Sequence, residues 1–114
     1  MNLEYSELED GIRLIKLTSM LDMDGTTSIG AEFARYCEGE NVFVLVDLER
    51  LTYLSSIGIP LLISNAKVVV ARGGRLALVK PQPNVKYVLD ITGVSHILRI
   101  YNDIETAQAR VKSA

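Results

Sequence analysis

The chain has 114 residues, of which 48% are hydrophobic and 23% are charged, and its 12 basic and 14 acidic side chains give a net charge of −2. This length and composition exclude a disordered chain and a second domain. The near balance of charge provides no basic footprint for nucleic acid or an anionic membrane surface. The single cysteine, Cys37, excludes an internal disulfide.

The start of the chain lacks the features of a signal peptide, and no apolar run approaches the roughly 20 residues that cross a bilayer. We therefore expect one cytoplasmic domain over residues 1–114, with no nucleic-acid partner and no direct membrane insertion.

In the first half of the chain, alternating apolar and polar residues predict a hairpin of strands 3–8 and 12–17, with its turn at Glu9-Asp10-Gly11. Helical spacing predicts a first helix over about 25–38. The apolar block 42–46 is typical of a central strand buried on both faces, and we expect it to end at Asp47.

The second half predicts alternating helices and strands: a helix over 59–72, a strand over 75–79, a helix over about 85–91 and a strand near 97–101. Asn102 is the expected N-cap of a closing helix that ends close to Lys112. The order predicts an α/β domain with a four- to five-stranded, mostly parallel sheet, an N-terminal β-hairpin and about four helices.

Sites in such sheets collect at the carboxyl ends of strands, where loops lead into helix N-termini. Asp22 and Asp24 follow one predicted strand, and the segment 47–59 follows the next. We expect Ser56 to be the N-cap of the second helix, which makes Pro60 the fourth helical residue. A phosphoryl group on Ser56 would then be held by the amides and the dipole of that helix.

Catalytic and metal-binding patterns are weak. Neither Ser55 nor Ser56 lies in a Gly-x-Ser-x-Gly elbow, and the one histidine, His96, has no partner nucleophile at the sequence level. One histidine and one cysteine cannot form a zinc site, and the loop carboxylates are typical of solvated caps. We expect no enzyme activity, no cofactor and no metal.

The segment from Val42 to Ile59 resembles the signature of the STAS domains, named for sulphate transporters and anti-sigma factor antagonists. In that signature a strand ending in Asp leads to an aromatic residue, an apolar residue, Asp-Ser, a small residue, Gly and an aliphatic residue. Three later segments, 73–79, 88–94 and 100–107, also resemble the family, so the resemblance covers nearly the whole chain.

The resemblance implies an anti-sigma factor antagonist that binds an anti-sigma factor serine kinase and catalyses nothing itself. The serine that the kinase phosphorylates falls on Ser56, with Ser55 as a second candidate, and a metal-dependent serine phosphatase reverses the modification. The family's acidic residue beside that serine falls on Asp22. The implied partner-binding residues are Asp22, Asp24, Ser55, Ser56, Ile57 and Gly58.

The sequence departs from the signature at Ser55, which stands in place of Asp, at Ile57, which replaces a small residue, and at Pro60. These departures leave an alternative open: a STAS binding module without a phosphorylation switch. Such a module could be a small subunit of a lipid-transport system or a nucleotide-binding STAS protein.

Overall fold

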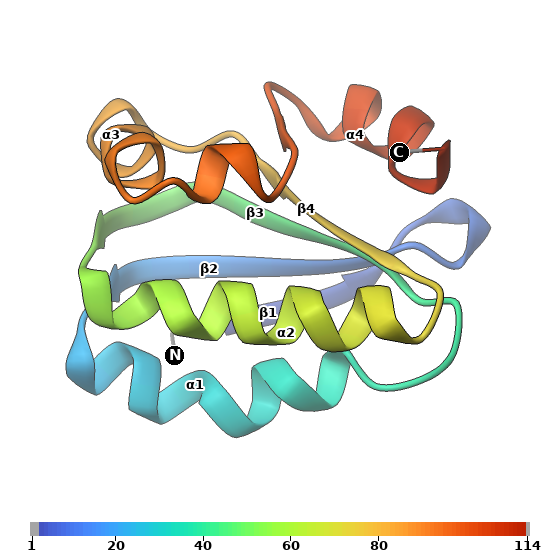
Figure 1. The fold of residues 1–114 in the computed structure, drawn as a ribbon, viewed down its shortest axis with the longest axis horizontal. Coiled ribbons are helices and arrows are strands. Elements are labelled where there is room, and N and C mark those ends of the chain that lie inside the picture. The colour runs from blue at the N-terminus through green and yellow to red at the C-terminus, as the bar shows by residue number, and fades with distance from the viewer. Residues whose placement is uncertain (1–2, 114) are drawn as a thin grey trace.

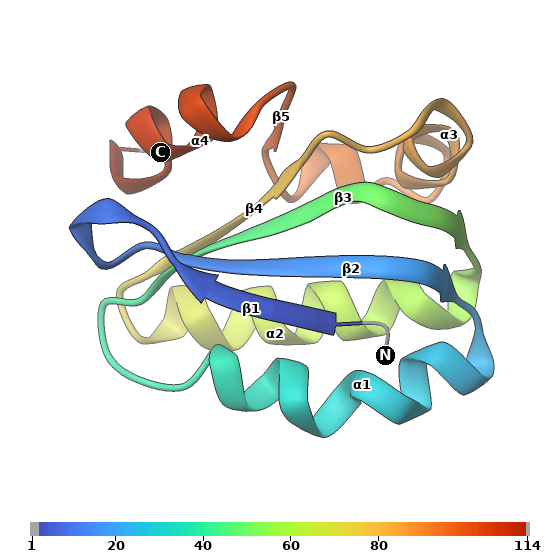
Figure 2. The same ribbon diagram turned by 180° about the vertical axis from the view of Figure 1, so that it is seen from behind.

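The computed structural model describes residues 3–113, which form one five-stranded sheet with helices on both faces (Figure 1 and Figure 2). The strands are ordered β1-β2-β3-β4-β5; β1 is antiparallel to β2, and the other neighbours are parallel. This topology confirms the predicted fold class. The strands are β1 (Leu3–Glu7), β2 (Arg13–Leu21), β3 (Phe43–Leu54), β4 (Arg75–Val79) and β5 (Ile100–Tyr101), and the helices are α1 (Met23–Tyr36), α2 (Ile59–Ala71), α3 (Pro83–Ile91) and α4 (Ile104–Arg110).

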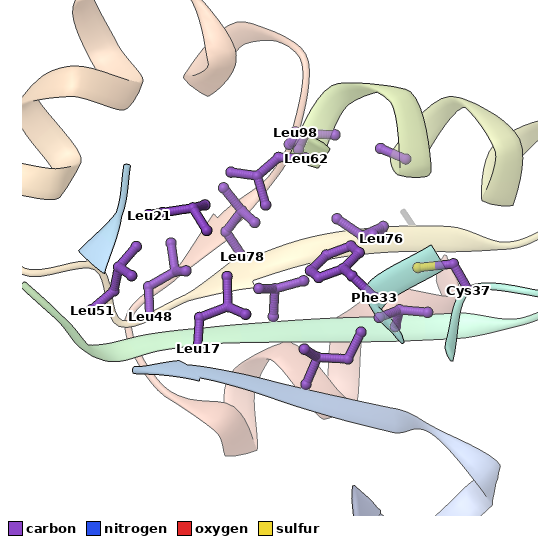
Figure 3. Close-up of a cluster of buried hydrophobic side chains, with 14 of the residues drawn as sticks. Leu17, Leu21, Phe33, Cys37, Leu48, Leu51, Leu62, Leu76, Leu78 and Leu98 are labelled. Carbon is purple, nitrogen blue, oxygen red and sulfur yellow. The ribbon is translucent and has the colours of Figure 1, made fainter. Parts of the chain in front are cut away.

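The sheet separates two hydrophobic cores, because successive side chains of a strand point to opposite faces. Helices α1 and α2 lie side by side over one face, where Phe33 and Leu62 pack on buried leucines of the strands (Figure 1 and Figure 3). On the other face α4 covers a smaller core, in which Ala107 and Val111 pack against residues of β2, β3 and β4. Packed helices therefore cover both faces of the sheet.

Strand β3 is longer than predicted, since it continues past Asp47 to Leu54. Asp47 is buried in mid-strand, where its carboxylate accepts a hydrogen bond from the amide of Glu49 (2.9 Å) and lies 3.6 Å from the Lys80 ammonium. Beyond it β3 stays paired with β2 as far as Leu21 and Leu54, through two register shifts. The expected end at Asp47 is wrong because distant partners keep this polar stretch in the sheet.

Other boundaries also differ from the prediction, and β2, for example, continues past residue 17 to Leu21. Helix α1 begins at Met23, because the carboxylate of Asp22 accepts the Gly25 amide at 2.8 Å and caps it. The last strand contains only the two residues of β5, since the amides of Ile97 and Leu98 donate to the carbonyl of Val94 at 2.9 Å and these residues form a turn. Helix α4 is capped by Asp103 and not by Asn102: the Asp103 carboxylate accepts the Thr106 amide at 2.7 Å. A capping carboxylate thus decides where the two helices begin, and a local turn decides where β5 begins.

Candidate functional site

The candidate site lies where the β2–α1 and β3–α2 connections meet, and Ser55 joins the two. Its amide and its hydroxyl both donate to the carbonyl oxygen of Leu21, each at 3.2 Å. The Ser55 hydroxyl also accepts the amide of Ile57 at 3.3 Å, so that Ser55 caps the 3-10 turn Ser56–Gly58 that leads into α2. Ser55 therefore has the structural role that the sequence analysis gave to Ser56.

Ser56 is the first residue of that turn and is exposed to solvent. Among residues 3–113, no side-chain hydrogen bond uses its hydroxyl. The expected cap at Ser56 is thus wrong, and so is the expected position of Pro60, which lies in the first turn of α2. Proline fits there because the amides of the first turn have no partner within the helix.

Three of the amides that follow Ser56 already have hydrogen-bond partners. Ile57 donates to the Ser55 hydroxyl, Gly58 donates to the Ser55 carbonyl at 3.0 Å, and Ile59 donates to the Ser56 carbonyl. Pro60 has no amide hydrogen. The turn therefore offers fewer free helix amides to a phosphoryl group than expected, and added charge on the exposed Ser56 would project into solvent.

Exposed apolar side chains lie at the same end of the sheet as Ser56. Met20 is 46% exposed and its register partner on β3, Tyr53, is 47% exposed. Met23, beside the Asp22 cap, and Ile57, next to Ser56, are exposed as well. We call these four residues together with Ser56 the Ser56 surface. Several large apolar side chains exposed at one end of a molecule are typical of interaction sites.

The sequence analysis missed Met20, Met23 and Tyr53 as parts of this surface. Their signal is present in the sequence, because the two methionines flank Leu21-Asp22, and Tyr53 stands at the aromatic position of the signature. Their convergence depends on the pairing of β2 with β3, which no local pattern reveals.

Asp22 and Asp24 give this end of the molecule a negative charge. Asp22 is half-buried as the cap of α1 and follows Leu21, the residue to which Ser55 is bonded, whereas Asp24 is exposed in the first turn. Gly58 is buried, and a methyl group added to it would meet the Leu21 side chain. The structure thus brings together the predicted residues Asp22, Ser55 and Gly58.

The remaining reactive side chains lie elsewhere. His96 is exposed on the 3-10 turn after α3. Cys37 is buried in the larger core, and loss of solvation raises the pKa of its thiol to about 12 (Figure 3). In the part of the chain that the structure describes, no three His, Cys, Asp or Glu side chains gather as metal ligands.

The model of the STAS domain family matches residues 6–107 of the chain. The chain belongs to the STAS domain family. Over residues 3–113, this STAS protein has no helix that combines the length and the apolar character of a membrane span.

Relatives of this STAS protein are named as anti-sigma factor antagonists. BtrV of Bordetella bronchiseptica, a candidate anti-sigma factor antagonist, is 30% identical over 105 residues, which are 92% of this chain and 90% of BtrV. The anti-sigma F factor antagonist of Paenibacillus polymyxa is 25% identical over 109 residues, 90% of each chain.

Solved structures confirm the fold. An anti-sigma-factor antagonist (STAS) domain protein from Planctomyces limnophilus superimposes with a TM-score of 0.88 at 21% identity, over 99% of this chain and 100% of the other. The anti-sigma factor antagonist SpoIIAA in its unphosphorylated form has a TM-score of 0.80 at 23% identity, over 98% of this chain and 97% of SpoIIAA.

Proposed function

We propose that this STAS protein is an anti-sigma factor antagonist that binds an anti-sigma factor serine kinase through the Ser56 surface and is released when the kinase phosphorylates Ser56. The observation that carries the proposal is the contrast between two adjacent hydroxyls. That of Ser55 is engaged with Leu21 and Ile57, whereas that of Ser56 is exposed and belongs to the same end of the sheet as four exposed apolar side chains. A metal-dependent serine phosphatase would restore the binding form.

The charge of the site explains how phosphorylation would release the partner. A phosphoryl group adds about −1.5 to −2 charges at neutral pH. Because the amides of Ile57, Gly58 and Ile59 already have partners, they compensate this charge poorly. Asp22 and Asp24 lie on the adjoining connection, so the phosphorylated surface would repel a partner fitted to the apolar, neutral form.

The departures from the STAS signature are compatible with this switch. Ser55 caps the 3-10 turn, a role that Asp also fills well at an N-cap. Ile57 is 45% exposed and adds apolar area to the docking surface, and Pro60 occupies a position where its missing amide hydrogen costs nothing.

Affinity capture tests the partner and the switch together. Wild type and Ser56→Asp are used as baits in lysate of the source organism, and retained proteins are identified by mass spectrometry. The matched control is Ser6→Asp, which adds the same charge on β1 opposite Leu14. Leu14 lies seven residues before Leu21 on β2, about 23 Å away along a strand. We expect a kinase-like ATPase to bind wild type and Ser6→Asp but not Ser56→Asp.

Phosphorylation by the captured kinase tests the acceptor. With ATP, wild type should gain one phosphate on Ser56 and Ser56→Ala none, while the mapped site in Ser55→Ala stays at Ser56. Equal incorporation into Ser56→Ala would refute the assignment. If wild type and Ser56→Asp retain the same partner, charge on Ser56 does not control binding. If that partner is a transporter subunit, the alternative of a STAS module without a phosphorylation switch is established.

A further inference from the structure

A second apolar surface lies between α2 and the segment 97–101, along the edge of β4 that faces away from β3. Two adjoining cavities of about 320 and 400 Å³ share Val70, Ile97 and Leu98 as lining residues. Val70 is 49% exposed and Ile97 is 63% exposed, so both are large apolar side chains open to solvent. We call these two cavities together the β4 groove.

The groove runs along backbone that lacks a strand partner. Strand β5 pairs only with Leu78 and Val79, and the amides of Leu78 and Lys80 donate to carbonyls of the β5 segment at 2.9 Å. The amide of Arg75 points the other way, to Val42 on the β3 side. Because backbone groups alternate along a strand, the amide and carbonyl of Leu76 face the same edge as those of Leu78. Among the described residues, no strand pairs with Leu76 on that side.

Basic side chains surround this open edge. Arg75 and Arg99 line the cavity at β4, and Lys67 lines the adjoining one. Arg110 and Arg99 line a third, smaller hollow next to it. Within residues 3–113, no carboxylate lines any of the three, although the whole chain carries a net charge of −2. The local charge therefore complements an acidic ligand.

We propose that the β4 groove binds an extended segment of a partner protein, apolar in the middle and acidic at its ends. The segment adds a short strand that pairs with Leu76, on the same edge of β4 where β5 pairs with Leu78 and Val79. The Leu76 backbone supplies main-chain hydrogen bonds. Alternate side chains of the segment pack on Val70 and Ile97 on one face and on Val111 on the other, and the basic rim pairs with the acidic ends. An open sheet edge flanked by pockets is the recognised geometry for such strand addition.

The β4 groove is separate from the Ser56 surface. Val70 lies 14 residues after Ser56, near the opposite end of α2, which is about 21 Å along a helix. The proposal therefore does not rest on the phosphorylation switch, and a partner bound in the groove leaves the Ser56 surface open.

Nuclear magnetic resonance on the whole ¹⁵N-labelled chain tests the proposal without a variant. The probe is the synthetic peptide Glu-Asp-Val-Ile-Val-Ile-Asp-Glu, and the control peptide has lysine at the four acidic positions. We expect the acidic peptide to shift the amides of Leu76 and Ala77 and to slow hydrogen exchange at Leu76. In the free protein that amide should exchange faster than that of Leu78, which is bonded to the Arg99 carbonyl.

Charge reversal at Arg99 tests whether the basic side chains around the β4 groove bind the acidic ends of the peptide. Arg99→Glu should weaken the acidic peptide about tenfold or more, and the control Arg50→Glu, an equal change at an exposed residue of β3, less than about twofold. Absence of peptide binding at about 1 mM, or shifts confined to the Ser56 surface, would overturn the proposal. Two other results would also overturn it. One is that the fatty acid dodecanoate binds in the β4 groove and the peptide does not, and the other is that self-association of the free chain already protects the Leu76 amide from exchange.

Discussion

The contact between Gly58 and Leu21 holds the two connections of the site together, and Gly58→Ala tests how tightly. A Cβ atom at Gly58 would lie 2.9 Å from Leu21 Cγ and 3.0 Å from both Leu21 Cδ2 and the Leu21 carbonyl oxygen. Carbon atoms in ordinary contact are about 3.5–4.0 Å apart. The same carbonyl oxygen accepts both hydrogen bonds from Ser55, so the added methyl group also strains the contact between the β2–α1 and β3–α2 connections.

The expected loss of stability follows from two opposing effects. Overpacking a buried contact costs about 1–3 kcal/mol. Gly58 has ordinary right-handed helical angles, so alanine recovers about 0.5–1 kcal/mol by restricting the unfolded chain. Three atoms at 2.9–3.0 Å place the overpacking cost in the upper part of its range, about 2–3 kcal/mol, so the net destabilisation is about 1–2.5 kcal/mol. This lowers the Tm of a domain of this size by roughly 5–12 °C.

Urea unfolding followed by circular dichroism measures the effect. The control is Gly30→Ala in α1, where a Cβ atom meets nothing within 4 Å, and it should stabilise the protein by about 0.5–1 kcal/mol. In a Leu21→Ala background, Gly58→Ala should lose much of its cost, a coupling of about 1 kcal/mol, because the two side-chain contacts are removed and only the contact with the Leu21 carbonyl oxygen remains. If Gly58→Ala is as stable as wild type, or lowers the free energy of unfolding equally in both backgrounds, Gly58 is not tightly packed against Leu21 and the reasoning fails.

Three further predictions follow from single contacts. Ser55→Ala should destabilise the fold by about 1–2 kcal/mol because two hydrogen bonds are lost, and Ser56→Ala by less than about 0.5 kcal/mol; equal effects in chemical unfolding would contradict the assigned roles. Cys37 should react with a thiol reagent at about pH 8 at least ~100-fold more slowly in the native protein than in urea, because burial shields the thiol and raises its pKa. The amide of Thr106 lowers the pKa of Asp103, so the carboxylate stabilises the fold above about pH 4 and this contribution disappears as pH falls through the lowered pKa. Asp103→Asn should therefore lose less Tm than wild type on acidification, and parallel curves would refute this.

The class of fold and most elements could be predicted because apolar periodicity follows burial directly. The strand at 75–79 and the helix that begins at 59 lie where their patterns place them. The end of β3 could not be predicted, because residues 47–54 contain charged and polar side chains typical of a loop. They stay in a strand through distant contacts: Asp47 with Lys80, and the Thr52 hydroxyl with the Ser19 carbonyl at 3.0 Å.

The site illustrates the same limit at the scale of one residue. The position of the serine pair could be read from the sequence, but not which of its members caps the turn, since adjacent serines have equal capping ability. The carbonyl of Leu21, 34 residues earlier, decides between them by accepting both Ser55 donors. Local patterns cannot include such a partner.

The smaller core has a consequence for biosynthesis. Ile12, near the start of the chain, is buried against Ala107 and Val111, near its end. The side chain of Lys112 also donates to the carbonyl of Asp10, across 102 residues. At about 5–20 residues per second, a ribosome needs roughly 5–20 s to make the segment between these partners. During that interval the C-terminal residues cannot cover Ile12, so the growing chain exposes apolar surface that the finished protein buries.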